Sequence, residues 1–168
     1  VAVTADRHGA FVEIAAALRA EGFDPRILHD LDALPDTVAG AVWCGGLAPA
    51  RDQDEALAQL EQACQLAQAM RPRLEAGGGL ALACEIDAAH GASAPLAALR
   101  GMVEGLALAL PHASAKLLEL PASSLGHDEL AAHLVHELCE GGQDVLVRRD
   151  ARGRHRPRWR PRPTSSTR

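Results

Sequence analysis

Tyrosine is absent from this chain, and Lys116 is its only lysine. Without tyrosine the chain has no phenol that could serve as a general acid. Aromatic side chains as a group are scarce, since the whole set is Phe11, Phe23, Trp43 and Trp159. This scarcity argues against a surface that stacks nucleobases or sugars. It predicts a core of alanine, leucine and valine, which suits close packing of helices on a sheet.

The chain also lacks long apolar runs and closely spaced cysteines. No run approaches the ~18 apolar residues that indicate a transmembrane helix, so no membrane partner is expected. Cys44, Cys64, Cys84 and Cys139 lie far apart and form no C-x-x-C motif. We interpret them as reduced core residues of a cytoplasmic protein, with metal binding as the minor alternative.

The length of 168 residues predicts one domain with enough chain to bury a core. We assign this domain to residues 1–160 and interpret residues 161–168, PRPTSSTR, as a linker or disordered tail. The chain begins with Val1, which already lies in an apolar run with no signal peptide ahead of it. We therefore expect a segment of a longer protein or a trimmed chain.

Charge is divided unevenly along the chain. Residues 1–147 carry 21 acidic and eight basic side chains, whereas residues 148–168 carry nine arginines and one aspartate. Arginines alternate with other residues from Arg152 to Arg162, which would place them on one face of a strand. We expect them to pair with an acidic surface of this domain or of a neighbouring one, with a non-native tail as an alternative. Only Trp159 interleaves them and the rest of the domain is acidic, so no nucleic-acid partner is expected.

Strand-like and helix-like segments alternate along the chain. Hydrophobic periodicity predicts strands at 1–6, 26–29, 39–45, 80–86 and 115–121, helices at 8–22, 52–73, 94–110 and 124–140, and a closing hairpin around a turn at 150–153. Such alternation predicts βαβ units with right-handed crossovers. The expected fold is therefore α/β, with a doubly wound, mostly parallel sheet flanked by helices.

Carboxylates gather at the start of the helix predicted for 52–73. Asp52 or Asp54 is the expected cap, and both favour the helix dipole, as do Glu55 and Glu61. Acid–base catalysis would require a pocket that raises one carboxyl pKa, and the sequence indicates none. We interpret these side chains as a solvated helix face.

Two serines precede the helix predicted for 124–140. Ser123 and Ser124 lack the G-x-S-x-G context of a hydrolase nucleophile. We interpret them as cap residues, with His127 and Asp128 as the alternative cap.

The first strand–helix turn, residues 4–11, does not have the composition of a dinucleotide site. It holds one glycine, Gly9, and nothing in it satisfies G-x-G-x-x-G. Asp6 would repel a pyrophosphate there, although Arg7 and His8 could offset it. We interpret the segment as a plain strand–helix turn, with nucleotide binding as the minor alternative.

Histidines of the helix predicted for 124–140 form a possible metal-ligating pair. His133 and His136 are three residues apart and could share a helix face. The surrounding sequence is not H-E-x-x-H, and no third ligand is evident. We interpret both as solvated, and an enzyme of unknown type that uses them is the alternative.

The helix predicted for 94–110 resembles the helix that carries Tyr-x-x-x-Lys in short-chain dehydrogenases/reductases. Aligned on that pattern, Ala92 stands in place of the tyrosine and Leu96 in place of the lysine. The strand before it leads to Glu85-Ile86-Asp87 where that family usually places its serine. The resemblance therefore implies this skeleton without its catalytic groups.

Three segments, in order, resemble the structural subdomain of ketoreductase domains in type I polyketide and polyunsaturated fatty-acid synthases. Ala41–Leu47 is similar to a strand ending in a small-residue turn, and Gly101–Pro111 to a helix of pattern G-x-x-x-x-L-A-x-E-x-P, with Ala109 in place of the acid. Val145–Arg158 is similar to the closing hairpin, with its Asp-x-x-Gly turn and its Pro-Arg pair. The resemblance covers residues 1–163, roughly.

This resemblance implies a truncated Rossmann-like scaffold with no catalytic, cofactor-binding or metal-binding residue of its own. The implied partners are the catalytic ketoreductase subdomain of the same polypeptide and other synthase domains. The catalytic half would handle NADPH and the carrier-bound β-ketoacyl group. Gly101 and Gly105, four residues apart, would then suit tight packing or an interdomain seam. The alternative is a Rossmann-like module that binds a nucleotide or carrier protein without catalysis.

Overall fold

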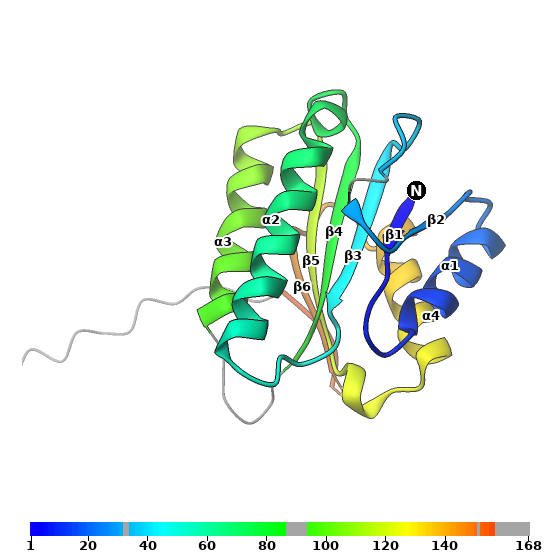
Figure 1. The fold of residues 1–168 in the computed structure, drawn as a ribbon. Helices are drawn as coiled ribbons and strands as arrows, with labels where there is room; N and C mark the ends of the chain where they lie inside the picture. Colours follow the sequence, from blue (N-terminus) through cyan, green and yellow to red (C-terminus); the bar gives the residue numbers. More distant parts are fainter. Residues whose placement is uncertain (32–33, 87–93, 151, 157–168) are drawn as a thin grey trace, which may run out of the picture.

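The computed structural model describes residues 1–31, 34–86, 94–150 and 152–156. A seven-stranded sheet with the order β2-β1-β3-β4-β5-β6-β7 forms its centre (Figure 1). The strands are β1 (Ala2–Thr4), β2 (Arg26–Leu28), β3 (Gly40–Gly46), β4 (Gly79–Glu85), β5 (Ser114–Leu120), β6 (Leu146–Asp150) and β7 (Gly153–His155). Strands β1 to β6 pair in parallel, and only β7 runs antiparallel to its neighbour. The predicted doubly wound α/β sheet with a closing hairpin is therefore confirmed.

Helices cover both faces of the sheet. They are α1 (Ala10–Ala20), α2 (Gln53–Glu75), α3 (Ala94–Ala109) and α4 (His127–Cys139), with a short 3₁₀ helix η2 (Ala122–Ser124) before α4. Figure 1 shows α2 and α3 on one side of the sheet and α1 and α4 on the other. Successive strand residues point to opposite faces, so Trp43 packs under the α2–α3 layer and Val42 under the α1–α4 layer. This explains why the central strands are apolar on both faces.

The expected helix caps are correct for α2 and wrong for α4. The Asp52 carboxylate accepts a hydrogen bond from the backbone N–H of Glu55 at 2.8 Å, as an N-cap should. The N-cap of α4 is Gly126, which makes no side-chain cap. Ser123 instead binds Glu85 through its hydroxyl at 2.6 Å and its N–H at 2.8 Å. Ser124 donates to the Pro121 carbonyl at 3.0 Å, because the 3₁₀ turn directs both serines away from α4.

The prediction of four core cysteines is correct for two of them. Cys44 and Cys84 are buried, and burial raises the pKa of both thiols. Cys64 is half-buried, and its Sγ lies 3.6 Å from the Sδ of Met102. Cys139 is exposed, because the last residue of α4 lies on the side of the helix that faces away from the sheet.

The outer face of helix α3, which includes Gly101, Gly105 and Leu108, is exposed to solvent. A Cβ added at Gly101 or Gly105 would meet no atom within 4 Å, so neither glycine supports close packing within the described residues. Leu108, on the same face, is 85% exposed. No helix in the described part of the chain combines the length and apolar character needed to cross a bilayer.

Some predictions concern residues outside the described ranges. These are Ala92 in place of the tyrosine, Asp87 at the end of the Glu85–Asp87 segment, the arginines from Arg158 onward, and the tail at 161–168. Leu96, which stands in place of the lysine, is a buried residue of α3 that packs in the core beneath the α2–α3 layer. The position that the resemblance associates with lysine therefore holds a packing side chain.

Candidate functional site

The first candidate site is the crevice where the strand order reverses. In open α/β sheets, ligands bind beyond the carboxyl ends of the strands at such a switch point. Here β1 pairs with β2 on one side and with β3 on the other, so the crevice lies beyond Thr4 and Gly46. A nucleotide would have to bind at this crevice in a fold of this topology.

A carboxylate of the chain, Asp6, lies at the entry to α1 and accepts one N–H of the first helical turn. Asp6 accepts hydrogen bonds from the backbone N–H groups of His8 and Phe11, both at 2.9 Å. Gly9 adopts a φ of +83°, which lets the turn fold back over this carboxylate. Free N–H groups at a helix N-terminus are what bind a phosphate, and Asp6 uses one of them, that of Phe11, together with the N–H of His8 in the turn before the helix. The predicted repulsion of a pyrophosphate therefore has a structural basis.

An ion pair between Arg7 and Glu55 spans the crevice. Arg7 pairs with Glu55 at the start of α2 and also donates to the Pro49 carbonyl at 2.7 Å. Glu55 in turn accepts from the backbone N–H of Arg51 at 2.6 Å. The side chains of Arg7 and Glu55 are each 31% exposed, so Glu55 is only partly solvated and is also engaged in an ion pair. Its partner lies 48 residues earlier in the chain, and helical periodicity contains no information about that contact.

The two glycines at the end of β3 serve the packing of a tryptophan. Trp43 is fully buried, and its Nε1 donates to Gln62 Oε1 at 3.1 Å. A Cβ at Gly45 would lie 2.7 Å from the Trp43 ring, and one at Gly46 would lie 2.8 Å from the Cβ of Cys84. Both positions therefore require glycine because of the indole beneath them. This small-residue turn has a structural cause that involves no phosphate.

A cavity of about 230 Å³ lies beside the crevice, between α2 and α3. Its walls are mainly apolar and include Trp43, Leu96 and Leu99. Asp52 and Glu85 are the acidic residues that line it. Both carboxylate oxygens of Glu85 accept from Ser123, and Asp52 Oδ1 accepts from the backbone N–H of Glu55.

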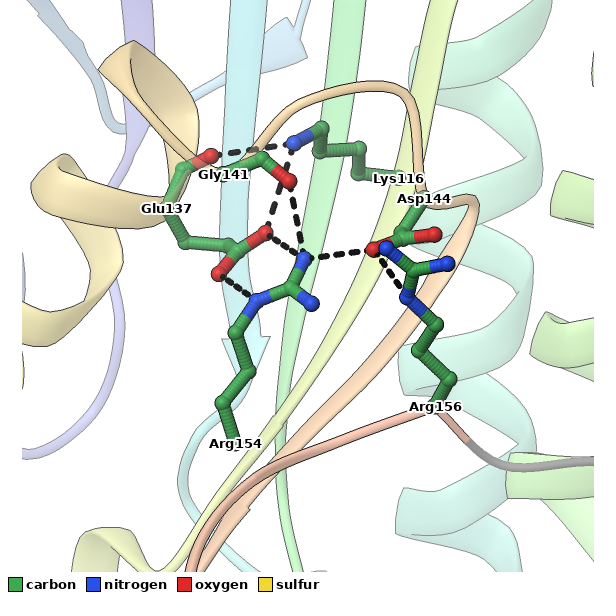
Figure 2. A network of polar contacts seen from close by, with 6 residues as sticks. All are labelled: Lys116, Glu137, Gly141, Asp144, Arg154 and Arg156. Carbon is green, nitrogen blue, oxygen red and sulfur yellow. Dashed lines mark hydrogen bonds and ion pairs between the residues drawn. The ribbon is translucent and has the colours of Figure 1, made fainter.

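A buried polar network joins α4 to the C-terminal hairpin (Figure 2). Glu137 accepts two hydrogen bonds from Arg154, at 2.8 and 2.7 Å, and its carbonyl accepts from Lys116 at 3.0 Å. Arg154 also binds the Gly141 carbonyl and Asp144, both at 2.8 Å. This network uses the only lysine of the chain as a structural donor. It fixes β7 against the helix layer.

A second buried carboxylate binds two arginines on the opposite face of the sheet. Glu119 of β5 is 1% exposed and accepts from Arg100 of α3 at 2.6 Å and from Arg148 of β6 at 2.7 Å. Arg156 pairs with Asp144 at 2.6 Å. The prediction that the alternating C-terminal arginines pair with an acidic surface is confirmed for Arg154 and Arg156, and the surface belongs to this domain.

The two histidines proposed as metal ligands have separate partners. His133 Nδ1 lies 2.8 Å from Nη1 of Arg149, and His136 Nδ1 lies 3.6 Å from Glu140. Nowhere in the described ranges do three or more histidine, cysteine or acidic side chains form a group that could hold a metal ion. His133 is half-buried, so its assignment to a solvated face is wrong, whereas His136 is exposed as expected.

The Figure 2 network predicts a loss of stability in acid. Burial would raise the pKa of Glu137, but Arg154 and Lys116 outweigh it and hold the pKa below its usual range, and Arg154 and Arg156 do the same for Asp144. A folded-state pKa below the unfolded value means that the stabilisation is complete above the unfolded values of about 4 and is lost as pH falls through the folded ones. We expect the melting temperature to fall as pH drops below about 4. A Glu137→Gln, Asp144→Asn double variant should show a shallower slope, and an unchanged slope would contradict this cause.

Together, the fold and the crevice define a class: a Rossmann-like α/β unit whose switch point is occupied by its own Asp6 and by the Arg7–Glu55 pair. No protein-family model and no curated protein matches the chain. Among solved structures, it is similar to the first ketoreductase of the tylosin polyketide synthase, with a TM-score of 0.58 and 18% identity over 91% of this chain and 37% of that chain. It is also similar to a ketoreductase domain from the bacillaene assembly line, with a TM-score of 0.51 and 13% identity over 91% of this chain and 31% of that one.

The chain spans about a third of the length of these ketoreductase structures. The similarity confirms the predicted fold, a Rossmann-like unit of the kind found within a ketoreductase domain. The resemblance found in the sequence motifs and the likeness in three dimensions therefore point to the same group of proteins.

Proposed function

We propose that this chain is the non-catalytic structural subdomain of a ketoreductase region in a polyketide or fatty-acid synthase. Its role would be to support a catalytic half that reduces a carrier-bound β-ketoacyl group with NADPH. The observation that carries the proposal is the self-occupied crevice: Asp6 accepts from the backbone N–H groups of His8 and Phe11 at the entry to α1, and Arg7 and Glu55 bridge the space a dinucleotide would need. The absence of tyrosine removes the phenol such a reduction would use.

The first test is a titration of the purified chain with NADPH and NADH by calorimetry, followed by an assay for NADPH oxidation with a β-ketoacyl thioester. We expect no saturable binding below the millimolar range and no turnover above the rate without protein. Saturable binding of micromolar strength, about −8 kcal/mol, would instead favour a nucleotide-binding module. Turnover that follows the protein through purification would contradict the scaffold.

The second test supplies the proposed partner. The reading frame that follows Arg168 in the parent gene should encode a G-x-G-x-x-G strand–turn–helix and a Tyr-x-x-x-Lys helix. We expect that polypeptide to be active when co-expressed with this chain, and to lose most of its activity or solubility without it. Equal activity in the absence of this chain would show that no scaffold is needed. A downstream sequence without those motifs would mean that the proposed catalytic partner does not follow this chain, and this would contradict the proposal.

A further inference from the structure

A polar cavity of about 550 Å³ lies between the start of α4 and the C-terminal hairpin. Pro121 and Leu125, from the segment that joins β5 to α4, give it an apolar wall, and Ser124 contributes a hydroxyl. The opposite wall comes from β6 and the hairpin turn. This volume is in the range of sites that hold small molecules. The cavity lies beyond the carboxyl ends of β5 and β6, whereas the crevice lies beyond those of β1 and β3.

Arg149 is the cation of this cavity, and it forms no ion pair with any described carboxylate. Its Nη1 lies 2.8 Å from His133 Nδ1, whereas its Nε is buried and has no acceptor among the described residues. Arg148 and Arg154 of the same hairpin both bind carboxylates. A buried donor without an acceptor is rare and requires an explanation. The cavity therefore contains a guanidinium with an N–H donor that no described residue accepts.

His133 fixes the orientation of this guanidinium. A guanidinium only donates, so Nδ1 of His133 must be the acceptor, and the imidazole proton belongs on Nε2. That Nε2 lies 4.0 Å from Glu129 on the cavity rim. With Nη1 engaged in this way, the Nε–Nη2 edge of Arg149 is left for a ligand. This edge is the fork that binds both oxygens of a carboxylate in parallel.

Two carboxylates on the cavity wall restrict the ligand. Asp150 Oδ1 accepts from the backbone N–H of Arg152 at 2.8 Å and lies 2.9 Å from His155 Nε2. Glu129 is mostly exposed at the rim. Both carboxylates would repel a dianion strongly, whereas they would repel a monoanion less. An ammonium or hydroxyl group at the far end of the ligand would find acceptors in these same carboxylates.

We propose that this cavity binds a small monocarboxylate that carries a hydrogen-bond donor at its other end, such as a short amino acid. The carboxylate would bind the Nε–Nη2 edge of Arg149, and the donor would face Glu129 and Asp150. Pro121 and Leu125 would cover the carbon chain. This inference stands apart from the scaffold role, because neither the crevice nor the outer face of α3 takes part in it.

The test is a titration followed by NMR on protein labelled with ¹⁵N-arginine, with 4-aminobutyrate, acetate and inorganic phosphate as probes. The Nε–H signal of Arg149, assigned as the one missing in Arg149→Lys, should shift and saturate with 4-aminobutyrate at a dissociation constant on the order of 1 mM. Acetate should bind at least threefold more weakly, and phosphate should not saturate. Arg149→Lys keeps the charge but loses the fork, so binding should fall at least tenfold.

Arg152→Gln is the matched control, since it removes an exposed arginine of the same hairpin and should leave binding unchanged. Circular dichroism will show whether each variant is folded. If Arg149→Lys does not fold, saturable titration of an arginine Nε–H signal of the unaltered chain by 4-aminobutyrate, compared with acetate and phosphate, still decides the matter. No saturable shift with either carboxylate, tighter binding of phosphate, or unchanged binding in a folded Arg149→Lys variant would each overturn the site.

Discussion

Replacing Glu137 with glutamine is expected to lower the free energy of unfolding by about 3 kcal/mol. Glu137 is almost fully buried in α4, and its carboxylate receives two hydrogen bonds from Arg154 and lies 3.5 Å from Lys116 Nζ. Without the negative charge, both cations stay at a poorly solvated position with less compensation, and removing one partner of a buried pair costs far more than the pair contributes. Urea unfolding followed by circular dichroism would measure the change.

Glu140→Gln provides the matched control for this prediction. Glu140 lies one turn further along, is mostly exposed, and is 3.6 Å from the ring of His136. Pairs of that kind contribute little, so we expect a loss below about 0.5 kcal/mol. If Glu137→Gln cost no more than Glu140→Gln, the network in Figure 2 would not be what holds the hairpin to α4.

Replacing Trp43 with alanine is expected to cost about 4 kcal/mol. The indole is fully buried at the centre of β3, and two glycines after it are required because their backbone lies against the ring. Few other aromatic side chains exist in this chain to fill the space that would be left. Trp43→Phe keeps most of the volume but loses the hydrogen bond to Gln62, so we expect a loss of about 1–2 kcal/mol.

Phe23→Ala is a suitable control for the tryptophan variants, since Phe23 is 42% exposed and should cost less than about 1 kcal/mol. Equal losses for Phe23→Ala and Trp43→Ala would contradict the central place of the indole. In that case Gly45 and Gly46 would also have no packing reason to be glycine.

The C-terminal hairpin shows which structural features could be predicted from the sequence and which could not. Asp150 and Gly153 mark the turn in the sequence, and they pair across it in the structure. The alternation of arginines indicated a strand face, but it could not show which arginines meet carboxylates. Arg154 and Arg149 look alike in the sequence, yet Arg154 binds Glu137 and Asp144, while Arg149 binds no carboxylate of the described residues.

The candidate crevice was harder to predict. The lack of a glycine-rich turn was evident from residues 4–11, and Asp6 was identified as a group that would oppose a phosphate. The contact of Glu55 with Arg7 across the crevice was missed, because the two residues are 48 positions apart in the chain. The prediction of Ser123 as a helix cap was wrong for the same reason. Its hydrogen bond to Glu85 joins segments that are distant in the chain, and local sequence patterns do not reveal such a contact.

The sequence by itself determined the order of strands and helices along the chain, the burial of the central strands on both faces, and the absence of any phenol. These depend on local periodicity and on composition, which are properties of short windows of chain. The tertiary structure alone decided which charges are buried, which glycines lie against a ring, and which arginine keeps an unused edge. The reason is that ion pairs and packing contacts join residues far apart in the chain, and their geometry exists only once the sheet and its two helix layers have formed.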